Sequence, residues 1–103
     1  MTRSSIGVAV IGAGMAGRAH AAGYRTATTL YGGGLPNVDL VAVADVNEAF
    51  ANDTAQRFGF ARAETSWEAI AEASDIDVVS VVVANTLHRE IVEALLAAGK
   101  HVL

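Results

Sequence analysis

The hydrophobic pattern of this sequence alternates between two kinds of segment. Continuous apolar runs rich in β-branched residues are typical of strands that are buried on both faces of a sheet. Three runs of this kind occupy residues 6–11, 39–45 and 77–83. Two shorter runs, at residues 60–63 and 101–103, predict further strands.

Between these runs the spacing of apolar residues changes to that of helices. Apolar positions three or four residues apart predict helices over residues 15–28 and 87–98. A third helix is expected behind the N-cap Asn47, with an inward face formed by Phe50, Thr54 and Phe58. A short fourth helix, with Trp67 in its apolar stripe, follows a capping box that starts at Thr65. The glycine-rich residues 32–37 predict a loop.

Strands and helices therefore alternate as β-α-β-α-β-α-β-α-β, which predicts a parallel α/β fold. Right-handed crossovers put helices on both faces, so we expect a Rossmann-type doubly wound sheet with strand order 3-2-1-4-5. The 103 residues form one domain. Because the chain stops three residues into a strand, we expect an N-terminal fragment, truncated before the last strand or two of the sheet.

Composition excludes several classes of protein. The chain is 52% hydrophobic and 17% charged, so it is not a disordered linker. No apolar run reaches the roughly 18 residues of a membrane span. A net charge of −4 without a basic cluster disfavours nucleic acid as a partner. Cysteine is absent, which excludes disulfides and thiolate metal sites and makes the cytoplasm the expected compartment.

A glycine-rich turn links the first predicted strand to the first predicted helix. The hexapeptide Gly-Ala-Gly-Met-Ala-Gly, which starts at Gly12, matches the G-x-G-x-x-G pattern of dinucleotide-binding turns. Gly12 permits a tight turn, Gly14 leaves space for a pyrophosphate, and Gly17 lets the helix pack closely. Free N–H groups at the helix N-terminus, around Met15 and Ala16, favour phosphate. A glycine-rich turn without a ligand is the alternative.

A carboxylate ends the second predicted strand. Asp45 can accept hydrogen bonds from both hydroxyls of an adenosine ribose and would repel a 2′-phosphate. Neither Val46 nor Asn47 supplies the arginine that a 2′-phosphate needs. The 33 residues from Gly12 to Asp45 exceed the usual spacing of about 20, because of the predicted loop and a long first helix. The pattern favours NAD over NADP, with a solvated strand end as the alternative.

Three segments, residues 6–20, 40–47 and 76–103, share a pattern in register with a known family. They resemble the glucose-fructose oxidoreductase, inositol dehydrogenase and rhizopine-catabolism (Gfo/Idh/MocA) family over essentially the whole chain. The resemblance implies a dinucleotide-binding domain at residues 1–103. Family members continue with a Glu-Lys-Pro segment and a second domain that supplies the catalytic Asp and His. We therefore nominate no catalytic residue here, and no residues have metal-ligand spacing.

The resemblance also implies contacts to nicotinamide. In the family, an Ala-Thr-Pro-Asn-x-x-His segment after the strand at 77–83 lines the nicotinamide half of the site. Asn85 and His88 match its Asn and His, whereas Val83-Ala84 replaces Thr-Pro and leaves this loop less rigid. An ordinary N-cap pair Asn85-Thr86 and a first-turn His88 are the alternatives. The expected cofactor-binding residues are Gly12, Gly14, Met15, Ala16, Gly17, Asp45, Val46, Ala84, Asn85 and His88.

The activity implied by the resemblance is hydride transfer between a sugar or polyol, inositol-like, and the nicotinamide of NAD. At full length we expect a dehydrogenase and a homo-oligomer, whereas residues 1–103 alone should be inactive. An NAD-dependent glycosidase of the same family and a non-catalytic dinucleotide-binding module remain alternatives. An S-adenosylmethionine methyltransferase is a third, although Val10-Ile11 lacks the acidic residue that usually precedes the turn in those enzymes.

Overall fold

The computed structural model of the chain describes residues 5–31 and 37–103, without the side chains of residues 27–31 and 85. Over this range, five strands form one parallel sheet in the order β3-β2-β1-β4-β5. The strands are β1 (Ser5–Ile11), β2 (Asn37–Ala44), β3 (Arg62–Glu64), β4 (Val78–Val81) and β5 (His101–Val102). The helices are α1 (Met15–Tyr31), α2 (Glu48–Phe58), α3 (Trp67–Glu72) and α4 (Asn85–Ala97). The predicted Rossmann-type fold and strand order are confirmed.

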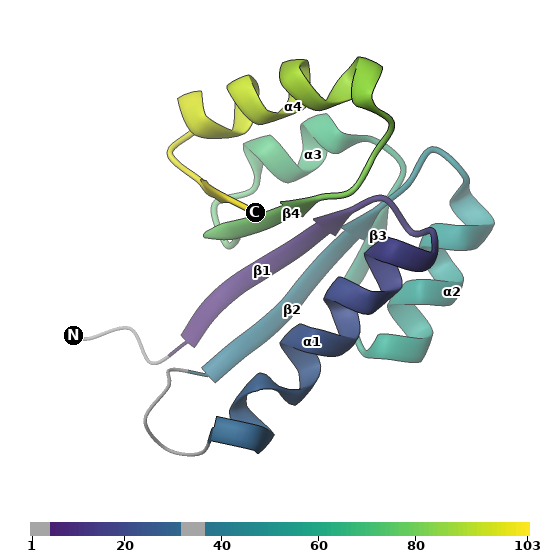
Figure 1. Cartoon of the computed structure of the whole chain (residues 1–103), viewed down its shortest axis with the longest axis vertical. Coiled ribbons are helices and arrows are strands. Elements are labelled where there is room, and N and C mark those ends of the chain that lie inside the picture. The colour runs from purple at the N-terminus through teal and green to yellow at the C-terminus, as the bar shows by residue number, and fades with distance from the viewer. Residues whose placement is uncertain (1–4, 32–36) are drawn as a thin grey trace.

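Helices cover both faces of the sheet (Figure 1). Helices α1 and α2 lie on one face, and α3 and α4 lie on the other. Successive side chains of β1 point to opposite faces, so Val10 joins an apolar cluster under α1 and α2, and Ile11 joins the larger cluster under α3 and α4. None of these helices is long and apolar enough to cross a membrane, as far as the described residues extend.

The predicted third strand is displaced along the chain. It was expected at residues 60–63, but β3 occupies Arg62–Glu64. The cause is the end of α2, where Gly59 adopts a φ of +79°. The N–H of Phe60 donates to the carbonyl of Ala55 and closes the helix, while its ring is buried in the cluster under α1 and α2. Phe60 therefore belongs to the helix terminus.

Helix α2 starts as predicted but presents a different face to the sheet. Asn47 Oδ1 accepts a hydrogen bond from the N–H of Phe50 at 3.1 Å, which confirms the N-cap. Phe50 was expected to point inward with Thr54 and Phe58, but its side chain is 51% exposed. Ala51 and Thr54 are the buried positions, because residues three apart share one face of a helix.

The N-caps of α3 and α4 also differ from the prediction. The capping box was placed at Thr65, but the cap of α3 is Ser66, whose Oγ accepts from the N–H of Ala69 at 3.2 Å. Helix α4 has its N-cap at Ala84, with no side-chain cap. Asn85-Thr86 lies inside the first turn, so the interpretation of this pair as N-caps is wrong.

The single lysine of the chain is buried. Lys100 is 8% exposed and directly precedes β5. Its Nζ donates to the carbonyl oxygens of Ala73 at 2.7 Å and Ile76 at 2.9 Å, which lie in the connection from α3 to β4. Hydrogen bonds from a charged donor are strong, and they compensate for the loss of water around the ammonium. Lys100 thus ties the start of β5 to the α3–β4 connection.

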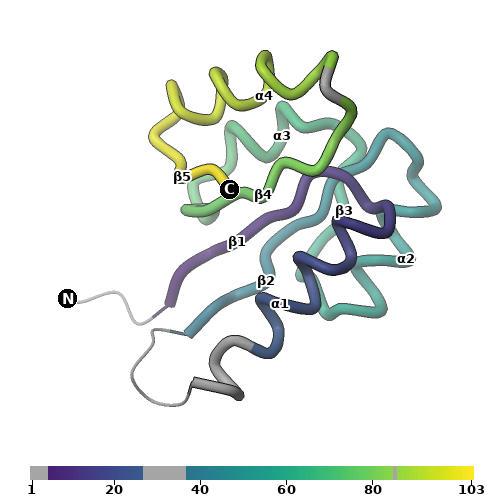
Figure 2. The backbone as a smooth tube through the Cα atoms, in the orientation of Figure 1, coloured from purple at the N-terminus to yellow at the C-terminus, as the bar shows by residue number. Residues whose placement is uncertain are grey.

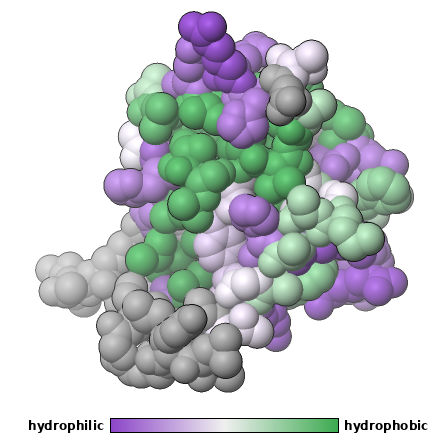
Figure 3. Space-filling view, in the orientation of Figure 1, coloured by the Kyte–Doolittle hydropathy of each residue, from purple (hydrophilic) through white to green (hydrophobic). Residues whose placement is uncertain are grey.

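Part of the sheet remains open on the side of α1. Strand β5 lies beside β4 at one edge of the sheet, where the C-terminus is found (Figure 2). Apolar side chains gather on the surface between α4 and α1 (Figure 3). Leu103, the last residue, is 67% exposed. Within the described residues, no helix covers the outer part of this face.

Candidate functional site

The carboxyl ends of β1, β2 and β4 meet at one edge of the sheet. The chain leaves β1 toward β2 on one side, and β4 is added on the other side of β1. Ligands of open α/β sheets bind at such a switch point. The ten predicted cofactor-binding residues follow the three strands: five after β1, two after β2 and three after β4.

Two glycines of the turn after β1 are required by the fold itself. Gly12 has a φ of +108°, its N–H donates to the carbonyl of Ala44 at 2.7 Å, and a Cβ there would overlap the carbonyl oxygen of Val82. A Cβ on Gly17 would overlap the carbonyl oxygen of Gly12. The turn can therefore approach both β4 and its own helix only because these positions lack side chains.

Gly14 differs from the other two glycines. It is exposed, and a Cβ built on it meets no atom within 4 Å. The fold does not need a glycine at this position, but the space beside it is open at the N-terminus of α1. Backbone N–H groups of the first helical turn have no partner within the helix, so this space is suited to an anion.

Asp45 is attached to the glycine turn by its carboxylate. Oδ2 accepts from the N–H of Ala13 and Oδ1 accepts from the N–H of Asn47, each at 2.8 Å. The side chain is half-buried between β2 and the turn rather than solvated at a free strand end. Each carboxylate oxygen keeps a further lone pair, so the group can still accept hydrogen bonds from a ligand.

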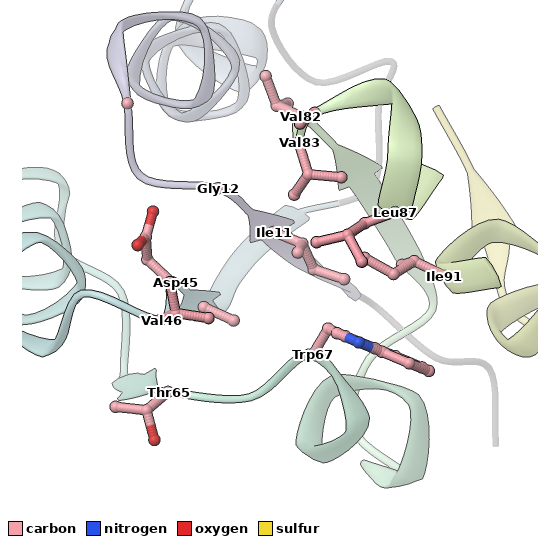
Figure 4. Close-up of a pocket in the computed structure, with 13 residues that line it drawn as sticks. Ile11, Gly12, Asp45, Val46, Thr65, Trp67, Val82, Val83, Leu87 and Ile91 are labelled. Atoms are coloured by element: carbon pink, nitrogen blue, oxygen red, sulfur yellow. The ribbon is translucent and has the colours of Figure 1, made fainter. Parts of the chain in front are cut away.

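A cavity of about 270 Å³ lies beside Asp45. Asp45 faces it from one side, and Trp67, Leu87 and Ile91 lie across from it (Figure 4). The remaining lining residues are mostly apolar and come from the strand ends and loops: Ile11, Gly12, Gly14, Ala44, Val46, Thr65, Val82, Val83 and Ala84. The cavity therefore suits a flat apolar group that is joined to a hydrogen-bonding one.

Five of the thirteen residues that line the cavity were predicted from the sequence. Gly12, Gly14, Asp45, Val46 and Ala84 were predicted as site residues, and all of them line the cavity. The other side was missed. Trp67 was predicted only as part of the apolar stripe of its helix, and Leu87 and Ile91 only fell within the helix expected over residues 87–98. The topology could have revealed it, since the segments after parallel strands β3 and β4 start at the same edge.

An ion-pair network lies on the side of the glycine turn that faces away from the cavity. Arg18 Nη2 contacts Asp53 Oδ2 at 2.8 Å, and Arg57 Nε contacts Asp53 Oδ1 at 3.0 Å. Hydrogen bonds from Arg57 and Arg18 hold the pKa of Asp53 below its ordinary value. Arg18 Nε also donates to the carbonyl of Ala13 at 3.2 Å. The network joins the start of α1 to α2 and to the glycine turn.

The remaining predicted residues lie around the rim. Met15, at the start of α1, has a side chain that is 90% exposed. Ala16 is also exposed, and it follows in the same helical turn. His88 lies exposed in the first turn of α4 and does not line the cavity, and Asn85 is the first residue of the same helix. No group of three His, Asp or Glu side chains that could hold a metal ion occurs in the described part of the chain.

Comparison with known proteins gives consistent matches. The Gfo/Idh/MocA family model, described as an oxidoreductase family with an NAD-binding Rossmann fold, matches residues 6–103. The chain is 34% identical over 100 residues to levoglucosan dehydrogenase of Pseudarthrobacter phenanthrenivorans. It is 38% identical over 104 residues to D-glucoside 3-dehydrogenase of Escherichia coli K12. These matches cover 96% and 100% of this chain but 25% and 27% of the relatives.

A solved structure agrees with these matches. Levoglucosan dehydrogenase in complex with NADH and L-sorbose superimposes with a TM-score of 0.90 at 32% identity. The match covers 97% of this chain and 27% of that chain. The chain therefore spans about a quarter of the length of the proteins it resembles. The methyltransferase alternative is excluded by the family match.

Proposed function

Because the chain belongs to the Gfo/Idh/MocA oxidoreductase family, with its NAD-binding Rossmann fold, we propose that it binds and orients the cofactor of a sugar or polyol dehydrogenase. One observation carries the proposal. The open space beside Gly14 and the cavity beside Asp45 are adjacent, and the hydrogen bond from Ala13 to Asp45 joins them into one site. An anion site next to an apolar cavity with a carboxylate at its edge fits a dinucleotide.

Different residues of the site would hold different parts of the cofactor. The adenine ring would lie in the apolar cavity against Trp67 and Leu87, with the ribose hydroxyls on Asp45. The pyrophosphate would lie at the N-terminus of α1, beside Gly14, where the helix dipole favours negative charge. Nicotinamide would then extend toward Ala84, Asn85 and His88.

The part of this chain in the reaction is orientation. When bound, NAD accepts a hydride from a C–H bond next to a substrate hydroxyl. The substrate must lie within about 3–3.5 Å of the nicotinamide, and a general base must take the hydroxyl proton. This chain would hold the cofactor in a fixed position. We assign the substrate pocket and the base to parts of the protein outside residues 1–103.

The substrate class is supported by the relatives. Levoglucosan dehydrogenase and D-glucoside 3-dehydrogenase are named for carbohydrate substrates, and the NADH complex also contains L-sorbose. We place this protein with them, as an NAD-dependent enzyme that acts on a carbohydrate or polyol. Its lack of cysteine supports a cytoplasmic location. The exposed apolar surface near Leu103 supports association with further protein, including a second copy.

The test uses the full-length protein and residues 1–103 side by side. NADH absorbance is followed while a panel of sugars, anhydrosugars and inositols is added with NAD. We expect turnover by the full-length protein and none by residues 1–103. Cofactor binding without turnover would favour a non-catalytic module. Glycoside cleavage without net NADH formation would favour the NAD-dependent glycosidase. Failure of the full-length protein to bind NADH would refute the proposal.

A further inference from the structure

The side of α1 that faces the sheet is built from very small residues. Gly17 and Ala21 are its buried positions, and Tyr24 is half-buried one turn further on. Small side chains bury little apolar area and form no large ridges that interlock with the sheet. Apolar packing alone therefore fixes the position of α1 along the sheet weakly.

A polar cluster adds directional contacts at this interface. Ser80 lies in β4 and is fully buried. Its neighbours Val79 and Val81 belong to the cluster under α3 and α4, so Ser80 faces α1. Its Oγ lies 3.0 Å from His20 Nδ1 and 2.6 Å from the hydroxyl of Tyr24. His20 is exposed, yet its ring nitrogen reaches the buried hydroxyl.

One buried hydroxyl can satisfy both partners, since it offers one donor and two acceptor lone pairs. His20 and Tyr24 are four residues apart and project from the same face of α1. Two hydrogen bonds that converge from successive helical turns restrict both rotation and sliding of the helix. A serine with no partner at this buried position would be costly, so helix and strand are coupled.

The two coupled elements carry different halves of the proposed site. Helix α1 begins at Met15, beside the open space at Gly14. Strand β4 continues into Val82, whose N–H donates to the carbonyl of Ile11 at 2.8 Å, and then into Ala84 at the start of α4. The position of α1 against β4 thus sets the separation of the phosphate side from the nicotinamide side.

We propose that His20, Tyr24 and Ser80 are positioning residues that hold the phosphate-binding end of α1 in register with the β4–α4 loop. This inference rests on the proposed function. A ligand that spans both halves of the site depends on this register. Adenosine occupies the cavity beside Asp45 but carries no phosphate that reaches α1, so its binding depends on this register far less.

The experiment compares NADH with adenosine on the full-length protein. Tyr24→Phe, Ser80→Ala and His20→Ala each remove one member of the cluster. His20→Asn restores an amide group near the place of Nδ1. Thr26→Ala is the control, because the Thr26 hydroxyl bonds the carbonyls of Ala22 and Gly23 in its own helix. Dissociation constants come from fluorescence titration, and thermal melting gives the Tm of each variant.

We expect Tyr24→Phe and His20→Ala, which each remove one hydrogen bond, to raise the Kd for NADH about fivefold, and Ser80→Ala, which removes both, to raise it at least as much. The Kd for adenosine should stay within about twofold. His20→Asn and Thr26→Ala should match the wild type. Unchanged NADH affinity in the three substitutions, with or without a lower Tm, would show a merely structural cluster and overturn the inference. Equal weakening of NADH and adenosine binding would overturn it as well. If the wild type itself does not bind NADH, the proposed function has failed instead.

Discussion

Asp45 accepts two backbone hydrogen bonds before any cofactor is present. Its two oxygens are held by the N–H groups of Ala13 and Asn47, so the turn after β1 and the turn after β2 meet on one carboxylate. Both contacts need an acceptor. An asparagine would offer one acceptor oxygen and turn an NH2 group toward the other N–H donor. The residue thus combines its proposed ligand-binding role with a role in the fold.

Cofactor selectivity follows from the charge of this residue. We expect the full-length protein to bind NADH at least about tenfold more tightly than NADPH, since a carboxylate near a phosphate dianion costs on the order of 1–4 kcal/mol. Asp45→Asn should narrow this difference by removing the charge. It should also lower the Tm, because one backbone N–H loses its acceptor. Fluorescence titration with both cofactors and a thermal melt measure the two effects, and equal affinities in the wild type would contradict the prediction.

Gly14 provides a test of the phosphate site that is separate from the fold. Gly14→Val should abolish NADH binding, because the side chain would fill the open space beside α1, while the circular dichroism spectrum stays close to that of the wild type. Gly23→Val is the matched control, since Gly23 lies in the helix that follows Gly14, α1, and likewise faces open space. It should leave both the helix and the affinity intact, because valine has a higher helix propensity than glycine. Unchanged NADH binding by Gly14→Val would mean that the turn faces no phosphate.

At the scale of elements, the spacing of hydrophobic residues was sufficient to predict the strand order. It was not sufficient to predict the residues at which helices and strands begin and end. A run such as residues 77–83 indicates a buried strand, and alternation with helices then allows few topologies. The ends of helices and strands depend on individual hydrogen bonds, which the spacing of hydrophobic residues does not reveal. Phe60 closes α2 through Ala55, and Ser66 rather than Thr65 caps α3.

The same limit applies to the site. Residues in a motif, such as Gly12 and Asp45, could be predicted because their types are tied to their chemistry. The spacing of apolar residues alone could not identify Trp67, because an apolar residue at helical spacing has the same pattern whether it faces a core or a cavity. The link between Ser80 and α1 is likewise invisible in the sequence, since its partners lie 56 and 60 residues away.

The contact between α1 and α2 should depend on pH. Asp53 bridges Arg18 and Arg57, and its lowered pKa means that the folded protein favours the carboxylate. Its contribution to stability is therefore complete above the unfolded aspartate pKa of about 4 and is lost as the pH falls through the folded value.

Asp53→Asn should accordingly lower the Tm by a few degrees at neutral pH and have little effect in acid, where both proteins carry an uncharged side chain. Thermal melts at several pH values measure the difference. Glu93→Gln is the control, because the exposed Glu93 pairs with the exposed Arg89 within α4 and joins no two elements. A Tm difference that persists unchanged into acid would assign the effect of Asp53→Asn to packing instead of charge.

At the scale of the molecule, the proposed cofactor site and the exposed apolar surface lie in different places. The site occupies the carboxyl edge of the sheet, where loops from three strands meet. The apolar surface lies between α4 and α1, near the exposed Leu103. A partner surface could therefore cover the apolar region and leave the entrance beside Asp45 open. This arrangement suits a chain that spans about a quarter of the length of its relatives.

Because Lys100 is buried, its chemical labelling can report the opening of the sheet edge at β5. Amine-reactive reagents need an accessible, uncharged amine, and this ammonium is bonded to the carbonyls of Ala73 and Ile76. Since the chain has no other lysine, modification away from the α-amino group reports a single event, the release of the start of β5. We expect Lys100 to react far more slowly in the native protein than in urea, as measured by mass spectrometry over time. Equal rates in both would mean that the two hydrogen bonds do not persist. Otherwise, the native rate relative to the rate in urea gives the fraction of molecules in which this edge is open.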